Sequence, residues 1–337
     1  MRKKPKGVIP PGLIYLADNI VSKQNVLGAS KKEGAKWAKD LDLSKKAETM
    51  LFVGCGYQYT SGLESLTSLM RKMDKSTIGT GLPMNIAGFQ KKLGVDLAGV
   101  YRKVAAKDDD VGIQTLKDAV KVLSNLKVKF SYLAEDEPCC GAPLHHFGMQ
   151  KEFVENAQAA YSRIKSFGVK RVIGIVPSCT YALRNLFPDC IDGYDLEVKH
   201  FSEVLLENIS SLELRFPKEV KVTYHDPCQL GRYLGLIEEP RQILKAIKGI
   251  ELVETEWTNG EWSTCCGGGG GLEAVLPELS QILAVNRAKE LVETGAQIIV
   301  THCPGCIMQI KAGLKELKAN DVEVLDLVQI VAKSMEV

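Results

Sequence analysis

Short runs of β-branched and other apolar residues alternate along the chain with segments in which apolar residues recur every three or four positions. The runs predict strands at residues 49–54, 128–133, 172–176 and 196–200, and again at 220–224, 250–253, 298–301 and 322–325. Helices are expected between them, one from Ile113 to Leu123 and another whose apolar face carries Phe153, Ala157, Tyr161 and Ile164. This alternation indicates an α/β fold with parallel sheets covered by helices.

The second half of the chain repeats the first. The sequence Glu-Pro-Cys-Cys-Gly at 137–141 returns as Ser-Thr-Cys-Cys-Gly at 263–267. Gly168 lies 11 residues before Cys179, and Gly295 lies 11 residues before Cys306. An internal duplication predicts two pseudo-symmetric lobes, each a small parallel sheet flanked by helices. We expect a lead-in segment at 1–48, a first cysteine-rich domain at 49–212 and a second at 213–337.

Charge and hydropathy exclude several classes of protein. The formal net charge is +2 and acidic and basic residues are interspersed, so no one-signed surface for nucleic acid is expected. No apolar run approaches the roughly 18 residues that a membrane helix needs, and no secretory signal follows the basic N-terminus. We therefore expect a cytoplasmic protein without a transmembrane segment.

Ten cysteines are many for a reducing compartment, and their spacing indicates a chemical role. In the second half, 36 residues separate Cys228 from a vicinal pair, and 36 more separate that pair from Cys303. A vicinal pair suits metal ligation better than a strained disulfide ring. Because parallel strands end at one edge of a sheet, where α/β proteins bind ligands, the thiols should meet there. The set is Cys228, Cys265, Cys266, Cys303 and Cys306.

Five thiolates at one edge are one more than tetrahedral zinc binds, and they suit an iron–sulfur cluster. Gly267 and Gly268 begin a run of five glycines, which lets the backbone fold closely round a bulky group and direct N–H groups at sulfur. Pro304 and Gly305 turn the chain between the last two cysteines. The competing interpretation is a set of buried free thiols, which is common for single cysteines.

These motifs resemble the cysteine-rich (CCG) domain of the heterodisulfide reductase family. That domain also occurs in iron–sulfur subunits of glycerol-3-phosphate, lactate, glycolate and some succinate oxidising systems. The resemblance is carried by His-Asp-Pro-Cys at 225–228, Leu-Gly-Arg-Tyr at 230–233, Cys-Cys-Gly at 265–267, Asn-Arg-Ala at 286–288, Thr-Gly-Ala at 294–296 and Cys-Pro-Gly-Cys at 303–306. A similar lead-in, Lys-Trp-Ala at 36–38 and Leu-Asp-Leu at 41–43, extends it over nearly the whole chain.

The resemblance implies a noncubane 4Fe-4S cluster on the five cysteines of the second half. It further implies an oxidoreductase subunit of the heterodisulfide reductase B or D type, which exchanges electrons with a disulfide or another organosulfur group, free or protein-bound, at that cluster. The tandem ferredoxin signature of fused members is absent from the sequence. A separate ferredoxin-like subunit is therefore implied as a partner, together with a flavin-containing subunit.

The first half departs from this pattern at one ligand. Val176 stands where the second half has Cys303. The four cysteines that remain are compatible with a second iron–sulfur cluster, with structural zinc or with no metal. They are Cys55, Cys139, Cys140 and Cys179.

The first half is also longer, with 83 residues between its first cysteine and its vicinal pair. Residues 77–84 are interpreted as a loop and residues 108–110 as a turn before a helix. A loop over the cluster and a tolerated surface insertion are both compatible with this surplus. Cys190 has no counterpart and is expected to be a structural thiol.

Four histidines lie near cysteines. His225 and His302 precede cluster cysteines, and His145 and His146 follow the first vicinal pair. Each is a candidate proton donor to a leaving thiolate or a hydrogen-bond donor to a ligating sulfur.

Three functional hypotheses follow. The first is an iron–sulfur subunit that acts on a disulfide or organosulfur substrate. The second is an electron relay between a flavin dehydrogenase and a quinone or other carrier, without a substrate site of its own. The third is a zinc scaffold without redox activity, which would show no visible absorbance.

Overall fold

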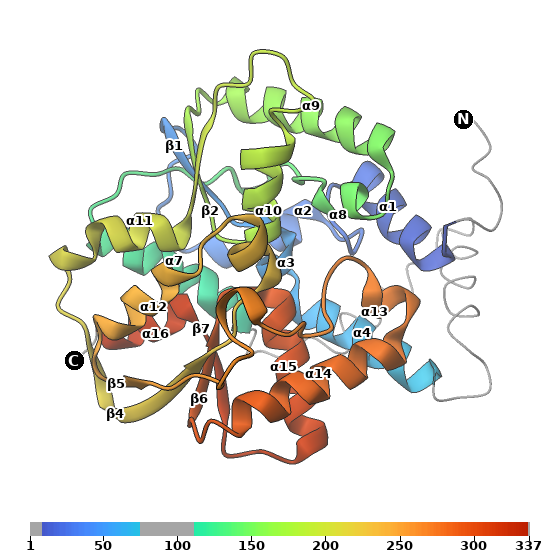
Figure 1. Cartoon of the computed structure of the whole chain (residues 1–337). Helices are drawn as coiled ribbons and strands as arrows, with labels where there is room; N and C mark the ends of the chain where they lie inside the picture. Colours follow the sequence, from blue (N-terminus) through green and yellow to red (C-terminus); the bar gives the residue numbers. More distant parts are fainter. Residues whose placement is uncertain (1–8, 75–110, 336–337) are drawn as a thin grey trace.

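Two parallel sheets form the framework of the protein (Figure 1). The computed structural model describes residues 9–74 and 111–335. The first sheet has the order β1-β2-β3, and the second has the order β5-β4-β6-β7. The strands are β1 Thr49–Phe52, β2 Arg171–Gly174, β3 Glu197–His200, β4 Arg215–Tyr224, β5 Lys248–Leu252, β6 Ile298–Thr301 and β7 Glu323–Asp326.

The two sheets share one connectivity, as the duplication predicts. β1, β2 and β3 correspond to β4, β6 and β7, and the place of β5 is taken in the first sheet by Ser131, which forms a parallel bridge with Met50. The predicted fold class, with two related parallel sheets flanked by helices, is therefore confirmed.

The prediction of a strand at 128–133 is wrong. Of residues 128–133, only Ser131 pairs with β1: its C=O accepts from Leu51 N–H at 2.8 Å and its N–H donates to Thr49 C=O at 2.9 Å. Ala134 then adopts a φ of 54° and the chain enters the 3-10 helix η2 Ala134–Asp136. This left-handed turn ends the pairing, although the β-branched pattern favours a longer strand.

Helices cover the two sheets (Figure 1). Those of the first half are α1 Pro11–Lys23, α2 Lys31–Gly34, α3 Gly54–Gln58, α4 Thr60–Asp74, α7 Val111–Asn125, α8 Ala142–His146, α9 Gln150–Ser166, α10 Pro177–Tyr181 and α11 Phe201–Asn208. Those of the second half are α12 Glu238–Lys245, α13 Leu272–Val275, α14 Pro277–Val292, α15 Pro304–Leu317 and α16 Leu327–Ser334. Shorter turns are η1 Lys36–Ala38, η3 Ala182–Leu186, η4 Ile209–Ser211, η5 Gln229–Tyr233 and η6 Gly260–Trp262.

The halves share one hydrophobic core. α7 packs against α16, and α11 packs against α12, so helices of one half lie on helices of the other. The predicted apolar face of α9 is buried at Phe153, Ala157 and Ile164, whereas Tyr161 is half-buried and its hydroxyl donates to Asp195 at 2.8 Å.

Other sequence expectations have mixed outcomes. The helix from Ile113 to Leu123 is confirmed as α7. The loop at 77–84 and the turn at 108–110 lie outside the described residues. The strands of the first sheet lie between residues 49 and 200 and those of the second between 215 and 326, but the domain limits at 48 and 212 stay predictions.

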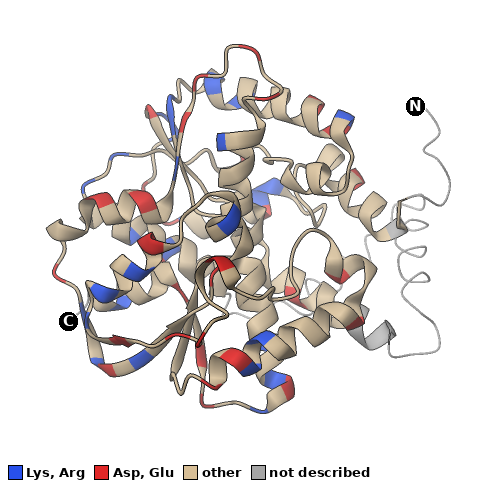
Figure 2. Cartoon of the chain, viewed as in Figure 1, with Lys and Arg blue, Asp and Glu red and all other residues tan. Residues whose placement is uncertain are grey.

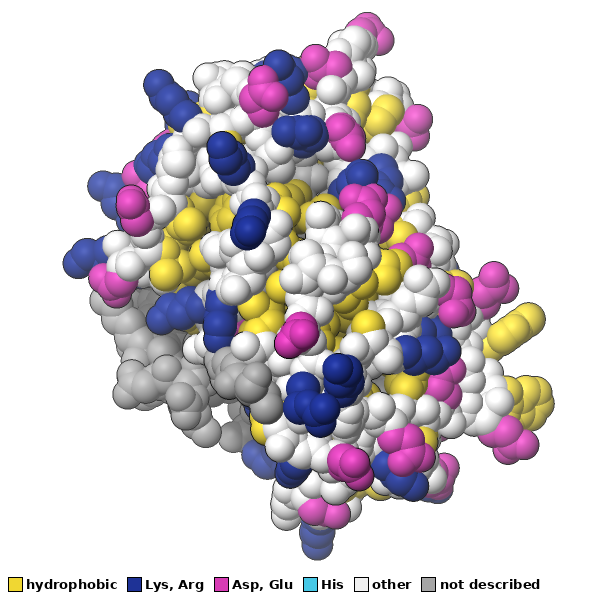
Figure 3. Space-filling model, turned by 90° about the vertical axis from the view of Figure 1, so that its left-hand side faces the viewer, with side chains coloured by type: hydrophobic (Ala, Val, Ile, Leu, Met, Phe, Trp, Pro, Cys, Tyr) yellow, Lys and Arg dark blue, Asp and Glu magenta, His cyan; other side chains and the backbone are white. Residues whose placement is uncertain are grey.

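Charged side chains are mixed over the surface. Basic and acidic residues are mixed over the molecule in Figure 2 and surround apolar side chains on the face in Figure 3. This distribution agrees with the small net charge of +2. Among the described helices, none combines the length and apolar character that crossing a bilayer requires.

Corresponding residues cap the helices that follow the last strand of each sheet. The His200 ring at the end of β3 accepts from Ser202 N–H at the start of α11. Asp326 at the end of β7 accepts from Val328 N–H at the start of α16 at 2.9 Å. Side-chain caps of this kind satisfy helix N–H groups that have no partner within the helix.

Asp326 also joins the two halves. One carboxylate oxygen accepts from His302 Nδ1–H at 2.8 Å, and the other accepts from the Tyr57 hydroxyl at 2.5 Å. Tyr57 belongs to α3 in the first half, and His302 directly precedes Cys303 in the second. All three side chains are fully buried, so the carboxylate is satisfied by hydrogen bonds across the junction.

We predict that Tyr57→Phe lowers the free energy of unfolding by about 1.5–3 kcal/mol, because it removes a buried hydrogen bond to a charged group. The matched control is Tyr161→Phe, whose hydroxyl bonds Asp195 at an exposed site and whose loss should cost no more than about 0.5 kcal/mol. Chemical denaturation of the two variants measures the difference. Equal losses would contradict a special role for the Tyr57 to Asp326 bond.

Candidate metal centres

The predicted ligands lie where the strands of each sheet end. Cys228 is the residue directly before η5, which follows β4. Cys303 is the residue directly before α15, which follows β6, and Cys306 lies in the first turn of α15. Cys265 and Cys266 follow η6, in the segment that leads from β5 to α13. The three segments meet because parallel strands present their carboxyl ends at one edge.

In the second half, sulfur atoms come within contact of one another. Cys266 Sγ lies 3.3 Å from Cys306 Sγ, and Gly267 N–H donates to Cys265 Sγ at 3.3 Å. Cys228 is close enough to Cys303 and Cys266 to interact with them electrostatically. The structure thus brings together all five predicted ligands of this half, which we call the second site, and all five are free thiols.

Access to the second site differs from ligand to ligand. Cys265 is exposed, Cys228 and Cys303 are half-buried, and Cys266 and Cys306 are each 4% exposed. Hydrogen bonds from Cys265, from Cys306 and, more weakly, from His225 hold the pKa of Cys266 well below its usual value. The bond to Cys266 in turn raises the pKa of Cys306. A lowered pKa favours the thiolate form of a cysteine, which is the form that binds metal.

The predicted glycine and proline positions support this site. A Cβ at Gly267, whose φ is +81°, would lie 2.3 Å from the carbonyl oxygen of Ser280, and one at Gly268 would lie 2.8 Å from Gln309 Cγ. Pro304 occupies the first turn of α15, and Gly305 lies beside the Cys303 sulfur. Side chains at the two glycine positions would push the loop away from the sulfurs.

A buried ion pair holds the strand end that carries Cys228. Asp226 and Arg241 form a two-point contact at 2.7 and 2.9 Å, and Asp226 also accepts from Gly260 N–H at 2.8 Å. Arg241 also pairs with Glu254 at 2.8 Å. Removal of either member of the Asp226 to Arg241 pair would still take a buried, charge-assisted contact from the other, which is costly. The pair therefore fixes the loop before η6 to the end of β4.

The four predicted histidines differ in burial and in contacts. His225 and His302 are buried, at 1% and 0% exposure, and lie beside the second site. The His302 ring contacts that of His200, with 4.8 Å between centroids. His145 contacts Gln150 at 3.2 Å, and burial lowers the pKa of His146. The role of each as a proton donor to a substrate or as a hydrogen-bond donor to a bound cluster stays a prediction.

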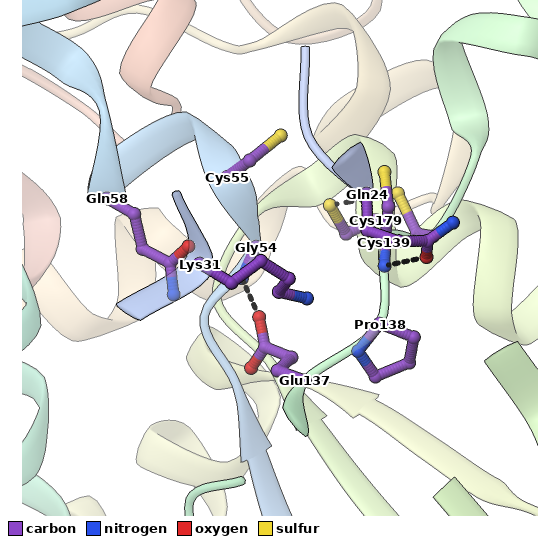
Figure 4. A pocket seen from close by; sticks show the side chains of 10 residues that line it. Gln24, Lys31, Gly54, Cys55, Gln58, Glu137, Pro138, Cys139 and Cys179 are labelled. Atoms are coloured by element: carbon purple, nitrogen blue, oxygen red, sulfur yellow. Dashed lines mark hydrogen bonds between the residues drawn. The ribbon is translucent and has the colours of Figure 1, made fainter. Parts of the chain in front are cut away.

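In the first half, four sulfurs form a separate group, the first site (Figure 4). Cys140 donates to Cys179 Sγ at 3.1 Å, and Gly141 N–H donates to Cys139 Sγ at 3.5 Å. Cys55 hydrogen-bonds Cys139, and this bond together with burial raises the pKa of Cys55. The structure brings all four predicted ligands of this half together.

Val176 fills the position of the missing fifth ligand. A Cβ placed on Gly54 would lie 2.9 Å from Cys179 Sγ and 3.3 Å from Val176 Cγ2, so the valine methyl and the cysteine sulfur border the same space. Cys190 lies elsewhere and donates to the carbonyl of Leu186 at 3.4 Å, in agreement with a structural thiol.

Glu137 is a feature of the first site that sequence reasoning missed. Its carboxylate accepts from Val53 N–H and Gly54 N–H, both at 2.9 Å, and it is 3% exposed (Figure 4). Burial raises its pKa to about 7. The corresponding residue of the second half is Ser263, so the first site alone has a carboxyl group at this position; only that departure from the repeat marked it in sequence.

The two sites face each other across the junction. A Cβ on Gly56, next to Cys55, would lie 2.7 Å from the ring of Pro304, next to Cys303. Tyr181 and Tyr233, which follow Cys179 and Cys228, have ring centroids 5.1 Å apart. The carboxyl edges of both sheets therefore border one central region.

Comparison with known proteins agrees with this architecture. The chain belongs to the CCG cysteine-rich domain family, whose model matches residues 106–184 and 222–311. The ranges contain every predicted ligand of both sites except Cys55. The resemblance inferred from sequence is confirmed.

Among curated relatives, the chain is similar to one of the subunits of dihydromethanophenazine:CoB–CoM heterodisulfide reductase from Methanosarcina acetivorans. The identity is 34% over 221 residues, which cover 64% of this chain and 54% of the relative. It is also similar to EtfAB:quinone oxidoreductase of Syntrophomonas wolfei, with 33% identity over 70% of this chain and 34% of the relative. One of the subunits of fumarate reductase (CoM/CoB) from Methanothermobacter marburgensis is 32% identical over 58% of this chain and 38% of the relative.

The chain spans about half the length of the heterodisulfide reductase subunits that it matches. Among solved structures, a hypothetical protein from Helicobacter pylori superposes with a TM-score of 0.52 at 16% identity, over 69% of this chain and 48% of that chain. That similarity concerns the fold alone.

We predict that Glu137→Ala destabilises the protein by roughly 1–3 kcal/mol, because two buried N–H groups lose their acceptor. The substitution should also lower the metal content of the first site, because the hydrogen bonds from these N–H groups to the carboxylate fix the turn that carries Cys55. Denaturation and metal analysis of the purified variant measure both effects.

The control is Glu135→Ala, which removes a neighbouring carboxylate that pairs with Lys45 on the surface and should change stability by no more than about 0.5 kcal/mol. If Glu137→Ala behaves like this control, the carboxylate does not organise the first site.

Proposed function

We propose that the chain is the iron–sulfur subunit of a heterodisulfide reductase-like complex, in which electrons pass to or from a disulfide or other organosulfur substrate at the second site. The observation that carries the proposal is the gathering of five free thiols at one sheet edge, with Cys265 exposed to solvent. A site with buried sulfurs on one side and an exposed sulfur on the other is suited to electron transfer to a substrate that approaches from solvent.

The sulfur set fits a cluster better than it fits zinc. Tetrahedral zinc uses four ligands, whereas five thiols meet here beside a backbone that admits a bulky group at Gly267 and Gly268. A noncubane 4Fe-4S cluster on Cys228, Cys265, Cys266, Cys303 and Cys306 is the cofactor we propose. When bound, it would supply one-electron transfer at the sheet edge.

The chain's own residues prepare the site for this group. Hydrogen bonds from Cys265 and Cys306 lower the pKa of Cys266, and Gly267 directs its N–H at the Cys265 sulfur. The hydrogen bond to Asp326 places a proton on His302 Nδ1 and fixes the ring beside Cys303. These contacts hold ligands in place before the metal arrives, which limits the reorganisation that binding requires.

The first site is proposed to hold a second iron–sulfur cluster or zinc on Cys55, Cys139, Cys140 and Cys179. Three of these thiols are buried, and Val176 occupies the position that corresponds to the fifth cysteine of the second site. Both features favour a closed four-ligand site, in which no position is left for a substrate. We propose one cysteine-rich domain for each site, at 49–212 and 213–337, after a lead-in at 1–48.

Because the chain covers only about half of its heterodisulfide reductase relatives, the partners are part of the proposal. A ferredoxin-like iron–sulfur subunit would bring or remove electrons, and a flavin-containing subunit would connect them to a two-electron donor. The organosulfur partner is either a small molecule or a protein-bound sulfur.

The second candidate function is a pure electron relay between a flavin dehydrogenase and a quinone or other carrier. The similarity to EtfAB:quinone oxidoreductase favours it. The exposed Cys265 favours the organosulfur reaction, since a relay needs no direct contact between substrate and ligand sphere.

We predict about four irons in the second site of anaerobically purified protein, with sulfide in similar amount and any zinc confined to the first site. Cys306→Ser should lose second-site iron, Cys179→Ser should lose first-site metal, and the control Cys190→Ser should lose neither. Iron, sulfide and zinc analysis per chain measures this. Zinc without iron in the wild-type protein would contradict both redox functions.

EPR spectra before and after addition of a thiol or disulfide separate the two redox candidates. A signal that changes with the thiol supports organosulfur chemistry at the second site. An iron signal that is insensitive to thiols, in protein that still exchanges electrons, would favour the relay.

A further inference from the structure

Arg287 is a fully buried charged side chain near the second site, and neither the ligand set nor the proposed reaction accounts for it. It lies on α14 and is 0% exposed. Its Nη1 donates to Glu290 at 2.7 Å and to Thr258 and Thr264. A guanidinium without exposure requires several such partners, because its charge does not leave it at neutral pH.

The remaining contact of Arg287 is to a histidine. Its Nε–H donates to Nδ1 of His225 at 2.9 Å. Since a guanidinium has only donors, Nδ1 must present its lone pair to it. A neutral imidazole with a lone pair on Nδ1 carries its proton on Nε2. Arg287 therefore selects one of the two tautomers of His225.

Within the described part of the chain, the Nε2 atom of His225 has no nitrogen or oxygen partner, although the residue is 1% exposed. A ring nitrogen of His225 and the sulfurs of Cys266 and Cys306 all lie within 4.8 Å of one another. A buried N–H without an acceptor is costly, and a thiolate or cluster-bound sulfur is the acceptor that the site offers.

We propose that Arg287 is a positioning residue that holds His225 in the Nε2–H tautomer, so that His225 donates a hydrogen bond to the Cys266 sulfur of the bound cluster. The proposal rests on the iron–sulfur function of the second site. It assigns His225 as a donor to sulfur and excludes it as a metal ligand.

The direction of the Arg287 contact supports this assignment. A metal-ligating histidine donates its other ring N–H to a carboxylate, carbonyl or water. In His225 the other nitrogen accepts from a cation instead, so the nitrogen that faces the sulfurs carries hydrogen and has no lone pair for iron.

The hydrogen bond would make the second site easier to reduce, because hydrogen bonds to cluster sulfurs stabilise the more negative, reduced form. The corresponding position of the first half offers no such donor. Three residues before Cys55 the chain has Phe52, where His225 stands three residues before Cys228. If the first site also holds a cluster, the two clusters would differ in reduction potential, because only the second has a histidine donor at this position.

Pulsed EPR on the loaded protein with 15N-labelled histidine tests the donor directly. We expect a 15N coupling and an exchangeable proton coupling at the second-site cluster, the proton being lost in deuterated buffer. Both should disappear in His225→Phe, which copies the phenylalanine of the first half. Loaded iron without either coupling, or couplings that persist in His225→Phe, would overturn the proposal. Absence of iron from the second site would overturn the proposed function as well.

Arg287→Met tests the positioning role. We expect unchanged iron per chain, a weaker proton coupling and a lower reduction potential. The matched control is Arg241→Met, which removes another buried guanidinium near the site, one that pairs with Asp226 and not with His225; it should retain the couplings in every molecule that holds iron. Retained couplings and potential in loaded Arg287→Met would overturn the role of Arg287 even if the variant is less stable.

Discussion

The buried carboxylate of Asp326 is the contact on which the relation between the two sites depends. It accepts from Tyr57 of the first half, from His302 beside the second site and from the N-terminus of α16. The halves also share one hydrophobic core, but apolar packing is not directional. Because carboxylate hydrogen bonds in a fully buried place are directional and costly to lose, this group adds a fixed orientation of the two carboxyl edges to the packing of the halves.

The duplication supplies a frame in which individual differences can be interpreted. Corresponding strands have the same order, and corresponding residues cap α11 and α16. Against this common frame, the first half has Val176, Glu137 and Phe52 where the second has Cys303, Ser263 and His225. The replacements remove one sulfur, add a carboxylate that fixes the turn at Gly54 and omit a donor to sulfur. Each of these positions distinguishes the first site from the second.

Seven of the eight strands predicted from sequence periodicity are present, as are the α7 and α9 helices, because the residues of these elements interact mainly with near neighbours and the core. The meeting of the cysteines could also be predicted, because their spacing and the parallel strand topology place them at the carboxyl edge of a sheet. Periodicity failed at 128–133, where the conformation of Ala134 overrides β-propensity. It also missed the bonds of Tyr57 to Asp326 and of Arg287 to His225, which join residues 269 and 62 positions apart and leave no periodic signal.

The exposure of the ligands argues for a division of labour. In the first site Cys139, Cys140 and Cys179 are each no more than 5% exposed, whereas in the second site Cys265 is exposed and its vicinal partner Cys266 is buried. In this vicinal pair one sulfur is exposed to solvent and the other is buried, so the two sides of the second site have different surroundings. His225, held by Arg287, lies on the inner side of that pair. Under the proposed function, a substrate would meet the outer sulfur of the pair, and His225 would influence the reduction potential of the cluster from the inner side.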